Sequence, residues 1–236
     1  MACGTWSIES APQDSRDSKA SFFDRRTLLR RLLMGLFSLG PLGAARVPSA
    51  MAATDSASVT ASGLIVAGDP VYGNPHGTVT IVDFNDIRCP PCRMMNQRVQ
   101  TLLKTDHSLR YVPIDYPILG PASELGVKAI FAAAMQGKYE ALRAILMHQK
   151  RKPDMAVLEQ NAKRAGLDLP QFALDMNGDR VAARVQRNLS RGRALAIHGI
   201  PTLFVGAKRI TGGLTYDDLR SVVEQAKKSA DNTNDI

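Results

Sequence analysis

The chain has 236 residues, of which 44% are hydrophobic, and its 30 Lys and Arg residues against 22 Asp and Glu give it a formal net charge of +8. A chain of this length can bury one well-packed domain, or one domain with an insertion. The positive excess is spread along the sequence, and its densest run, Lys150-Arg151-Lys152, looks like a solvated turn before Pro153, so the composition argues against binding of nucleic acid.

The N-terminal region has the three parts of a cleavable export signal. Residues 24–52 begin with a group of arginines, continue with an apolar run over 32–45, and end in Ala50-Met51-Ala52, a small-residue cleavage pattern. The apolar run is shorter than the roughly 20 residues that a membrane-spanning helix needs. We therefore expect residues 1–52 to be a leader and cleaved signal, and the mature protein to be periplasmic without a permanent membrane anchor.

Two export routes fit this signal. The string DRRTLLR, with Arg25 and Arg26 as the pair, resembles a twin-arginine export motif. The alternative is a general secretion signal with an arginine-rich start. Residues 53–63, which are small and polar, are expected to form a flexible linker after cleavage.

The first predicted elements of the mature chain lead to a cysteine pair. Leu64-Ile65-Val66 is expected to be a short strand, and the apolar run from Thr78 to Phe84 a buried central strand. The motif Cys89-Pro90-Pro91-Cys92 follows, and the helix-compatible stretch RMMNQRVQTLLK comes after it. Because proline is tolerated in a first helical turn, we expect a helix to start near Pro91 with Cys89 at its N-terminus.

Two cysteines separated by two residues fit a redox-active disulfide, half of a metal site or an inert pair. The third cysteine, Cys3, lies in the segment expected to be removed, and the four histidines show no tight pairing with each other or with the cysteines. A structural zinc site needs about four ligands. A helix N-terminus favours a thiolate, the form that attacks disulfides. The pattern therefore favours a redox-active Cys89–Cys92 disulfide with no metal and no cofactor.

The remaining elements follow in chain order. Leu109 to Ile114 is expected to be the next strand, parallel to the first if the connecting helix crosses right-handedly. From residue 122 to 196, apolar residues recur at three- and four-residue spacing, which predicts a block of four or five helices. Strands return at Thr202–Val205 and Arg209-Ile210, and a final helix is expected from near Thr215.

This order, with the cysteine pair after the first core strand, resembles the DsbA family of exported thiol:disulfide oxidoreductases. The matching residues are Gly73-Asn74-Pro75, the run VTIVDF, Asp86 and the cysteine pair. A second match, the string HGIPTLFV at 198–205, lies far along the chain on the other side of the helical block. The resemblance covers roughly residues 64–228.

The resemblance implies an α/β thioredoxin-like fold with a central mixed sheet. A β-α-β half is expected at 64–121 and a β-β-α half at 197–228, with an inserted all-helical subdomain at 122–196 between them. Residues 229–236 are left as a disordered tail.

The resemblance also implies roles at the two motifs. Cys89 would be the exposed nucleophile and Cys92 the buried resolving thiol. Pro201, in cis after Ile200, would pack beside the disulfide and leave a backbone edge to which a substrate segment can pair. The prolines between the cysteines, Pro90 and Pro91, are expected to contact the substrate as well.

Asp83 lies on the strand before the cysteine pair, where the family places a buried acid that accepts or relays the proton of Cys92. A carboxyl in an apolar run such as VTIVDF has a raised pKa if it is buried, which suits proton transfer to a thiol. The alternative is a partly solvated Asp at a strand end. Asp86 and Arg88 are expected to be solvated loop residues.

Two functions from different classes fit these observations. The first is a periplasmic protein-disulfide oxidoreductase, with exported cysteine-containing proteins as substrates and a membrane redox partner that recycles it; oxidase, isomerase and reductase directions stay open. Strong oxidants of the family carry His between the cysteines, whereas Pro90-Pro91 offers no side-chain donor, so the couple is expected to be less oxidising.

The second function is that of a copper-binding or delivery protein using the same cysteine pair, with Met94 and Met95 as added ligands. At helical spacing, the methionines fit core or rim positions better.

Overall fold

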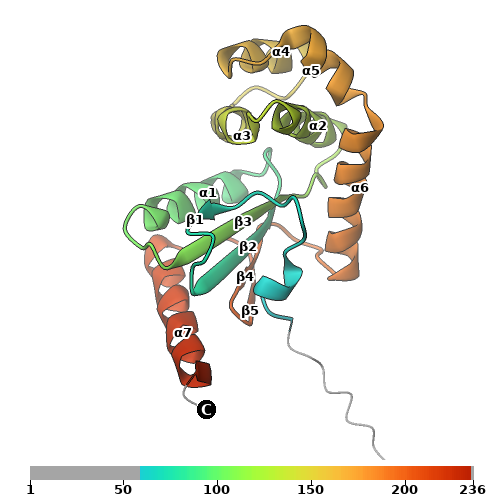
Figure 1. Ribbon diagram of the computed structural model, residues 1–236. Coiled ribbons are helices and arrows are strands. Elements are labelled where there is room, and N and C mark those ends of the chain that lie inside the picture. Colours follow the sequence, from blue (N-terminus) through green and yellow to red (C-terminus); the bar gives the residue numbers. More distant parts are fainter. Residues whose placement is uncertain (1–58, 235–236) are drawn as a thin grey trace, which may run out of the picture. The chain divides into compact units, whose positions relative to one another are not determined.

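The computed structural model describes residues 59–234 (Figure 1). The expected signal and most of the expected linker lie outside the described residues. The elements are η1 (Ser62–Leu64), β1 (Tyr72–Gly73), β2 (Val79–Asn85), α1 (Pro90–Leu103), β3 (Leu109–Asp115), α2 (Pro121–Met135), α3 (Tyr139–His148), α4 (Met155–Arg164), α5 (Leu169–Met176), α6 (Asp179–Ala194), β4 (Thr202–Val205), β5 (Lys208–Thr211) and α7 (Tyr216–Asn234). Among residues 59–234, no helix combines the length and apolarity needed to cross a membrane.

The strands form one mixed sheet in the order β1-β3-β2-β4-β5. β2 and β3 are parallel, with α1 as the crossover between them, and β4 and β5 are added as an antiparallel hairpin next to β2. All seven residues of the central strand β2 are buried, because both faces of the sheet are covered, which is why the strand is apolar over most of its length. The thioredoxin-like fold predicted from the element order is confirmed.

The two faces of β2 pack against different parts of the chain. Val79 and Ile81 belong to a core shared with α1 and α7, whereas Val82 and Phe84 pack with residues that precede β1 and follow α6. Because side chains alternate along a strand, Asp83 shares the face of Val79 and Ile81. The strand therefore places this carboxyl under the helix that begins at the cysteine pair.

Helices α2 to α6 have a hydrophobic core of their own. In Figure 1, α2 to α5 lie beyond one end of the sheet and α6 runs down beside it. Ile87, two residues before Cys89, is buried in this core. A Cβ added at Gly126 of α2 would come within 2.4 Å of Ile87 Cδ1. Glycine at this position therefore lets α2 approach the loop that carries the first cysteine.

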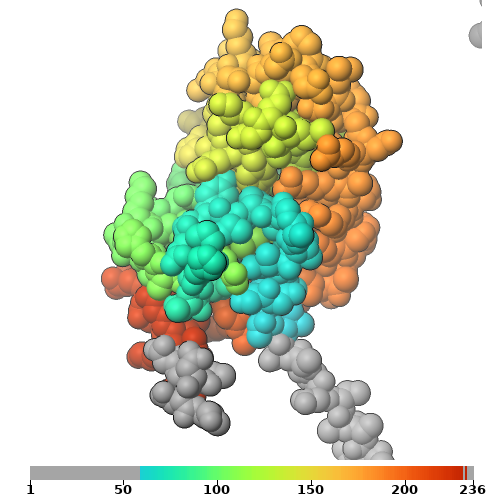
Figure 2. All heavy atoms as spheres, in the orientation of Figure 1, coloured from blue at the N-terminus to red at the C-terminus, as the bar shows by residue number. Residues whose placement is uncertain are grey.

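The segment before β1 is fastened to α6, which Figure 2 shows beside it on the surface. The Asp69 carboxylate, with 2% of its side chain exposed, accepts two hydrogen bonds from Arg191, each 2.9 Å long. Arg187 lies 3.6 Å from the same carboxylate. A bidentate, largely buried pair of this kind is stronger than an exposed salt bridge.

Three parts of the sequence-based prediction are wrong. Residues 64–66 form no strand: Leu64 ends η1 and Leu64 and Ile65 pack on a face of the sheet, while the edge strand forms later, at Tyr72–Gly73. Residues 59–63 do not behave as a free linker, because Ala61 is fully buried and its N–H donates to the Gly206 carbonyl at 2.6 Å. Residues 229–234 are not a disordered tail, since α7 continues to Asn234.

Candidate active site

Cys89 is the N-cap of α1, directly before Pro90. Its Sγ accepts a hydrogen bond from the backbone N–H of Cys92, with a donor–acceptor distance of 3.4 Å. A hydrogen bond from the Cys92 thiol lowers the pKa of Cys89 to about 7, with burial opposing and the Cys92 N–H assisting. The dipole of α1 favours the same thiolate, while Pro90 and Pro91, the first two helical residues, have no N–H to donate to it. The first cysteine is therefore poised to ionise near neutral pH.

Cys92 lies one turn into the helix and is fully buried, whereas Cys89 is 6% exposed. Its hydrogen bond to Cys89 and its burial raise the pKa of Cys92 well above the ordinary thiol value, and the charge of Asp83 adds to the increase. Both cysteines are free thiols in the structure. Cys89 is the more accessible of the two, although it is much less exposed than the sequence-based expectation implied.

The two sequence motifs, more than a hundred residues apart, meet at Cys89. The peptide bond between Ile200 and Pro201 is cis, as predicted, and the Cys89 thiol lies 3.8 Å from the Ile200 carbonyl oxygen, to which it donates. Pro201 is buried, whereas Pro90 and Pro91 are exposed. The structure thus brings both motifs to one surface where a second chain could reach Cys89.

Asp83 is fully buried on β2, as the apolar run around it predicts. Its Oδ2 accepts a hydrogen bond from the Tyr111 hydroxyl at 2.9 Å, while its Oδ1 is buried without a hydrogen-bond partner in the described structure. Burial raises the pKa of Asp83 to about 7, against a lowering by the Tyr111 hydrogen bond and by the charge of Arg143. This carboxyl can therefore gain or lose a proton near neutral pH.

Asp86, expected from the sequence to be solvated, is fully buried and organises the loop before Cys89. Its Oδ1 accepts from the Arg88 N–H and from the Ser123 hydroxyl, both at 2.8 Å, and its Oδ2 accepts from the Leu119 N–H at 3.1 Å. The Asp86 carbonyl oxygen accepts the Cys89 N–H at 3.0 Å. Asp86 therefore connects the cysteine loop to the start of α2.

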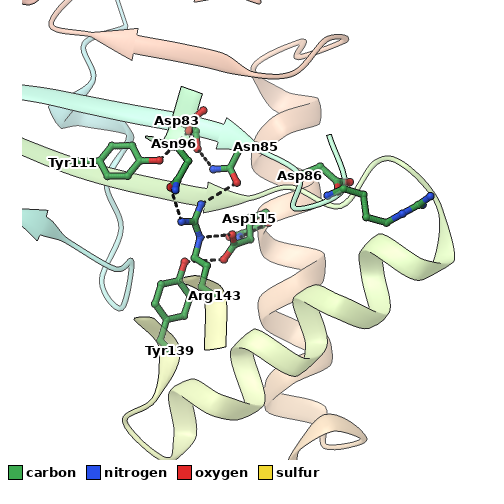
Figure 3. Close-up of polar contacts among 10 residues, drawn as sticks. Asp83, Asn85, Asp86, Asn96, Tyr111, Asp115, Tyr139 and Arg143 are labelled. Carbon is green, nitrogen blue, oxygen red and sulfur yellow. Dashed lines mark hydrogen bonds and ion pairs between the residues drawn. The ribbon is translucent and has the colours of Figure 1, made fainter. Parts of the chain in front are cut away.

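A buried arginine links the inserted helices to the sheet, as Figure 3 shows. Arg143 of α3 has 3% of its side chain exposed and donates to Asp115 of β3 at 2.9 Å. It also donates to Asn96 of α1 and Asn85 of β2, each at 3.0 Å. Tyr139 donates to the second oxygen of Asp115 at 2.7 Å. Each of the three guanidinium nitrogens therefore donates a hydrogen bond within a buried network.

Sequence reasoning missed this network. Arg143 lies in the amphipathic helix KYEALRAILMHQ, where a single basic residue is normally read as part of a solvated face. The signal that could have revealed it is Asp115, an acid at the end of the apolar strand LRYVPID. A carboxylate in such a position needs a buried partner, but the sequence does not say which residue supplies it.

The methionines after the cysteine pair have different environments. Met95 is fully buried in the core between α1, α7 and the sheet, and its Sδ accepts from the Leu214 N–H at 3.5 Å. Met94 is 48% exposed. Within residues 59–234, no group of three or more His, Cys, Asp and Glu side chains is arranged to hold a metal ion.

Comparisons with known proteins agree with the fold. The family model described as Thioredoxin matches residues 66–225. The crystal structure of a thioredoxin-like oxidoreductase from Silicibacter pomeroyi superposes with a TM-score of 0.66 and 34% identity, covering 70% of this chain and 95% of that one. The probable disulfide bond formation protein D of Bacillus anthracis is 22% identical over 169 residues, which are 66% of this chain and 77% of that protein.

Another relative is much longer. The Na(+)/H(+) antiporter NhaA 3 of Salinispora tropica is 30% identical over 164 residues, 69% of this chain but 25% of the antiporter. This chain therefore spans only about a quarter of that relative's length.

The family model covers well over half of the described residues, and the cysteine pair and the cis-proline element lie within it. The chain belongs to the thioredoxin family, within which it is of the DsbA-like type.

Proposed function

We propose that the protein is a periplasmic thiol:disulfide oxidoreductase that exchanges disulfides with exported proteins through Cys89-Pro90-Pro91-Cys92. The observation that carries the proposal is the pairing of two unlike thiols. Cys89 stands at a helix N-terminus with a pKa lowered to about 7, and Cys92 is buried behind it with a raised pKa. One thiol is thus ready to attack a substrate, and the other is held back for the second step.

The exchange proceeds in two balanced steps in the reducing direction. The Cys89 thiolate attacks one sulfur of a substrate disulfide, forming a mixed disulfide while the other substrate sulfur leaves as a thiolate. Cys92 then loses its proton, and its thiolate attacks Cys89 Sγ. The Cys89–Cys92 bond forms, the second substrate thiolate leaves, and the substrate is reduced as the enzyme is oxidised. Oxidation of a substrate dithiol is the same sequence reversed.

Asp83 is the proposed acceptor for the Cys92 proton. It lies on the sheet face that α1 covers, it is buried, and its pKa is raised to about 7. A carboxyl with a pKa near the working pH can take a proton and return it. The resolving thiol needs such a group because burial excludes water from it.

The proposed substrate surface consists of the exposed Pro90 and Pro91 together with the Ile200 carbonyl side of the cis-proline element. The Cys89 thiol already lies 3.8 Å from the Ile200 carbonyl oxygen. A substrate segment laid against this backbone would bring its cysteine to Cys89. The signal pattern at residues 24–52 supports export, and an exported dithiol enzyme needs a membrane redox partner to recycle it.

The proposal is tested with the purified protein and its Cys89→Ser variant. The wild type is expected to accelerate reduction of insulin by dithiothreitol, and to equilibrate its Cys89–Cys92 disulfide with glutathione buffers at a single midpoint. Cys89→Ser should abolish both activities. A protein that binds Cu(I) stoichiometrically but neither reduces insulin nor equilibrates with glutathione would overturn the proposal in favour of copper handling.

A further inference from the structure

The two carboxylate oxygens of Asp83 have different surroundings. Oδ2 accepts a hydrogen bond from Tyr111, and Oδ1 is buried without a partner among the described residues. Buried polar atoms are rarely left unsatisfied, because the loss of hydration is not recovered. The charge of Asp83 acts on both thiols, so an unsatisfied oxygen on this acid points to a use of that oxygen during the reaction.

The sheet holds Tyr111 in this position. Tyr111 lies on β3, beside Ile81 of the parallel strand β2, so the alternation of side chains places it on the same face as Asp83. The ring is fully buried and packs against Tyr72 with centroids 5.9 Å apart. The hydroxyl therefore has little freedom to turn away from the carboxylate.

We propose that Tyr111 is a positioning residue for the proton exchange: by occupying Oδ2 of Asp83, it leaves Oδ1 as the oxygen that takes the proton from Cys92 and returns it. This inference rests on the proposed function. In the resolving step, the O–H bond forms at Oδ1 as the S–H bond of Cys92 breaks, and the sulfur electron pair forms the bond to Cys89. The Tyr111 proton stays on the phenol throughout.

A neutral donor suits this task better than a cation would. Burial raises the pKa of Tyr111 well above its ordinary value, and the charge of Asp83 raises it further, so the phenol stays protonated and can only donate. Arg143, whose charge acts on Asp83, does not contact its carboxylate and is bound by Asp115, Asn85 and Asn96. Asp83 thus has the hydrogen bond from Tyr111 and a weaker interaction with the Asn85 side chain, but no ion-pair partner in the described structure that would keep it permanently ionised.

The test compares two phenylalanine substitutions. In Tyr111→Phe the ring and its packing are kept and only the hydrogen bond to Asp83 is lost. Tyr139→Phe is the matched control, because it likewise removes a hydroxyl that donates to a buried carboxylate, that of Asp115. A mixed disulfide of Cys89 with a coloured aryl thiol is prepared for each protein, and release of the thiol by Cys92 is followed against pH.

In the wild type, release should rise with pH as Asp83 ionises. Tyr111→Phe should shift this rise upward by about one pH unit or more, because a hydrogen bond to the charged form is lost, and should slow release about tenfold below the midpoint. The rate at which Cys89 is alkylated should change by less than about twofold. Tyr139→Phe should leave the release profile in place.

An unshifted profile for Tyr111→Phe, or an equal shift for Tyr139→Phe, would overturn the inference. A wild type that shows no release dependent on Cys92 would instead overturn the proposed function.

If Tyr111→Phe fails to fold, 3-fluorotyrosine is placed at position 111. As a stronger donor, it should shift the profile to lower pH, and a shift to higher pH or no shift would also overturn the inference. Tyr111→Phe should add nothing to the profile of Asp83→Asn, since the tyrosine acts through that carboxylate.

Discussion

The carboxylate of Asp86 accepts a hydrogen bond from the Ser123 hydroxyl at 2.8 Å, which fastens the loop before Cys89 to the first turn of the inserted helices. The same carboxylate raises the pKa of Cys89 through its charge, a smaller effect than the hydrogen bond from Cys92. One buried acid therefore both shapes the cysteine loop and restrains the ionisation of its nucleophile.

We predict that Asp86→Asn raises the alkylation rate of Cys89 at pH 6–7, because the nearby negative charge is lost. The variant should also unfold about 1–2 kcal/mol more easily, since an amide nitrogen cannot accept the Leu119 N–H. Iodoacetamide kinetics against pH and urea unfolding measure the two effects. Asp106→Asn is the control, because Asp106 also accepts an N–H two residues ahead and a serine hydroxyl. Equal acceleration in both variants would contradict the prediction.

We predict that Cys92→Ser accumulates mixed disulfides with substrate proteins, whereas Cys89→Ser accumulates none. The reason is that only Cys89 is accessible and ionised near neutral pH, so only it can form the first bond. Non-reducing electrophoresis of the affinity-purified variants measures the amount of mixed disulfide. Alkylation at pH 7 should be at least about tenfold faster at Cys89 than at Cys92. Similar rates at the two thiols would contradict the assignment of Cys89 as nucleophile and Cys92 as resolving thiol.

The third position of the motif is predicted to set the redox potential. Pro91→His should make the Cys89–Cys92 couple more oxidising, because a histidine donor stabilises the Cys89 thiolate and thereby the reduced form. One charge-assisted hydrogen bond, about 1.4 kcal/mol, corresponds to roughly 30 mV for a two-electron couple, and titration against glutathione resolves that difference.

Pro170→His is the control for this substitution. Pro170 is the second residue of α5, follows an N-cap residue in the same way as Pro91, and is likewise exposed. The control should leave the potential unchanged. If Pro91→His has the potential of the wild type or a more reducing one, the helix N-terminus and burial dominate, and the donor argument fails.

Asp83→Asn is predicted to stabilise the reduced protein at neutral and alkaline pH. Burial raises the pKa of Asp83 from 3.8 to about 7, so the folded protein holds a proton that the unfolded chain has released between these values. The unfolding free energy of the wild type should therefore fall as pH rises through this window. The gap to Asp83→Asn should grow from near zero below pH 4 towards about 4 kcal/mol above pH 7, as measured by urea unfolding. A gap that does not change with pH would contradict the raised pKa.

The part of the site that the sequence predicts is the part encoded by short motifs. Cys89 and Cys92 stand between an apolar strand and a helix-compatible stretch, and Asp83 lies inside an apolar run, so local pattern indicates each of them. The cis bond before Pro201 was expected from the family resemblance. The strand at 64–66 was predicted wrongly because an isolated apolar triplet can pack on a sheet face as well as pair at its edge.

The contacts between elements could not be predicted in the same way. Asp86 looks solvated in sequence because its partners, Ser123 and Leu119, are more than thirty residues away. Tyr111 looks like an ordinary strand aromatic until the parallel register pairs it with Ile81, on the same sheet face as Asp83, whose carboxylate it reaches. The tail after residue 228 looks disordered by composition because Ser, Asp, Asn and Thr are weak helix formers, yet α7 continues through it to Asn234.

The guanidinium of Arg143 is bound at once to α1, β2 and β3, although it belongs to α3. Detaching the inserted helices would take the Arg143 guanidinium away from the buried Asp115 carboxylate, and removing one partner of a buried ion pair costs about 3–5 kcal/mol. The inserted helices α2 to α6 therefore do not move as a hinged lid relative to the sheet. They should melt with the sheet in one calorimetric transition, their amides exchanging with deuterium only through global opening.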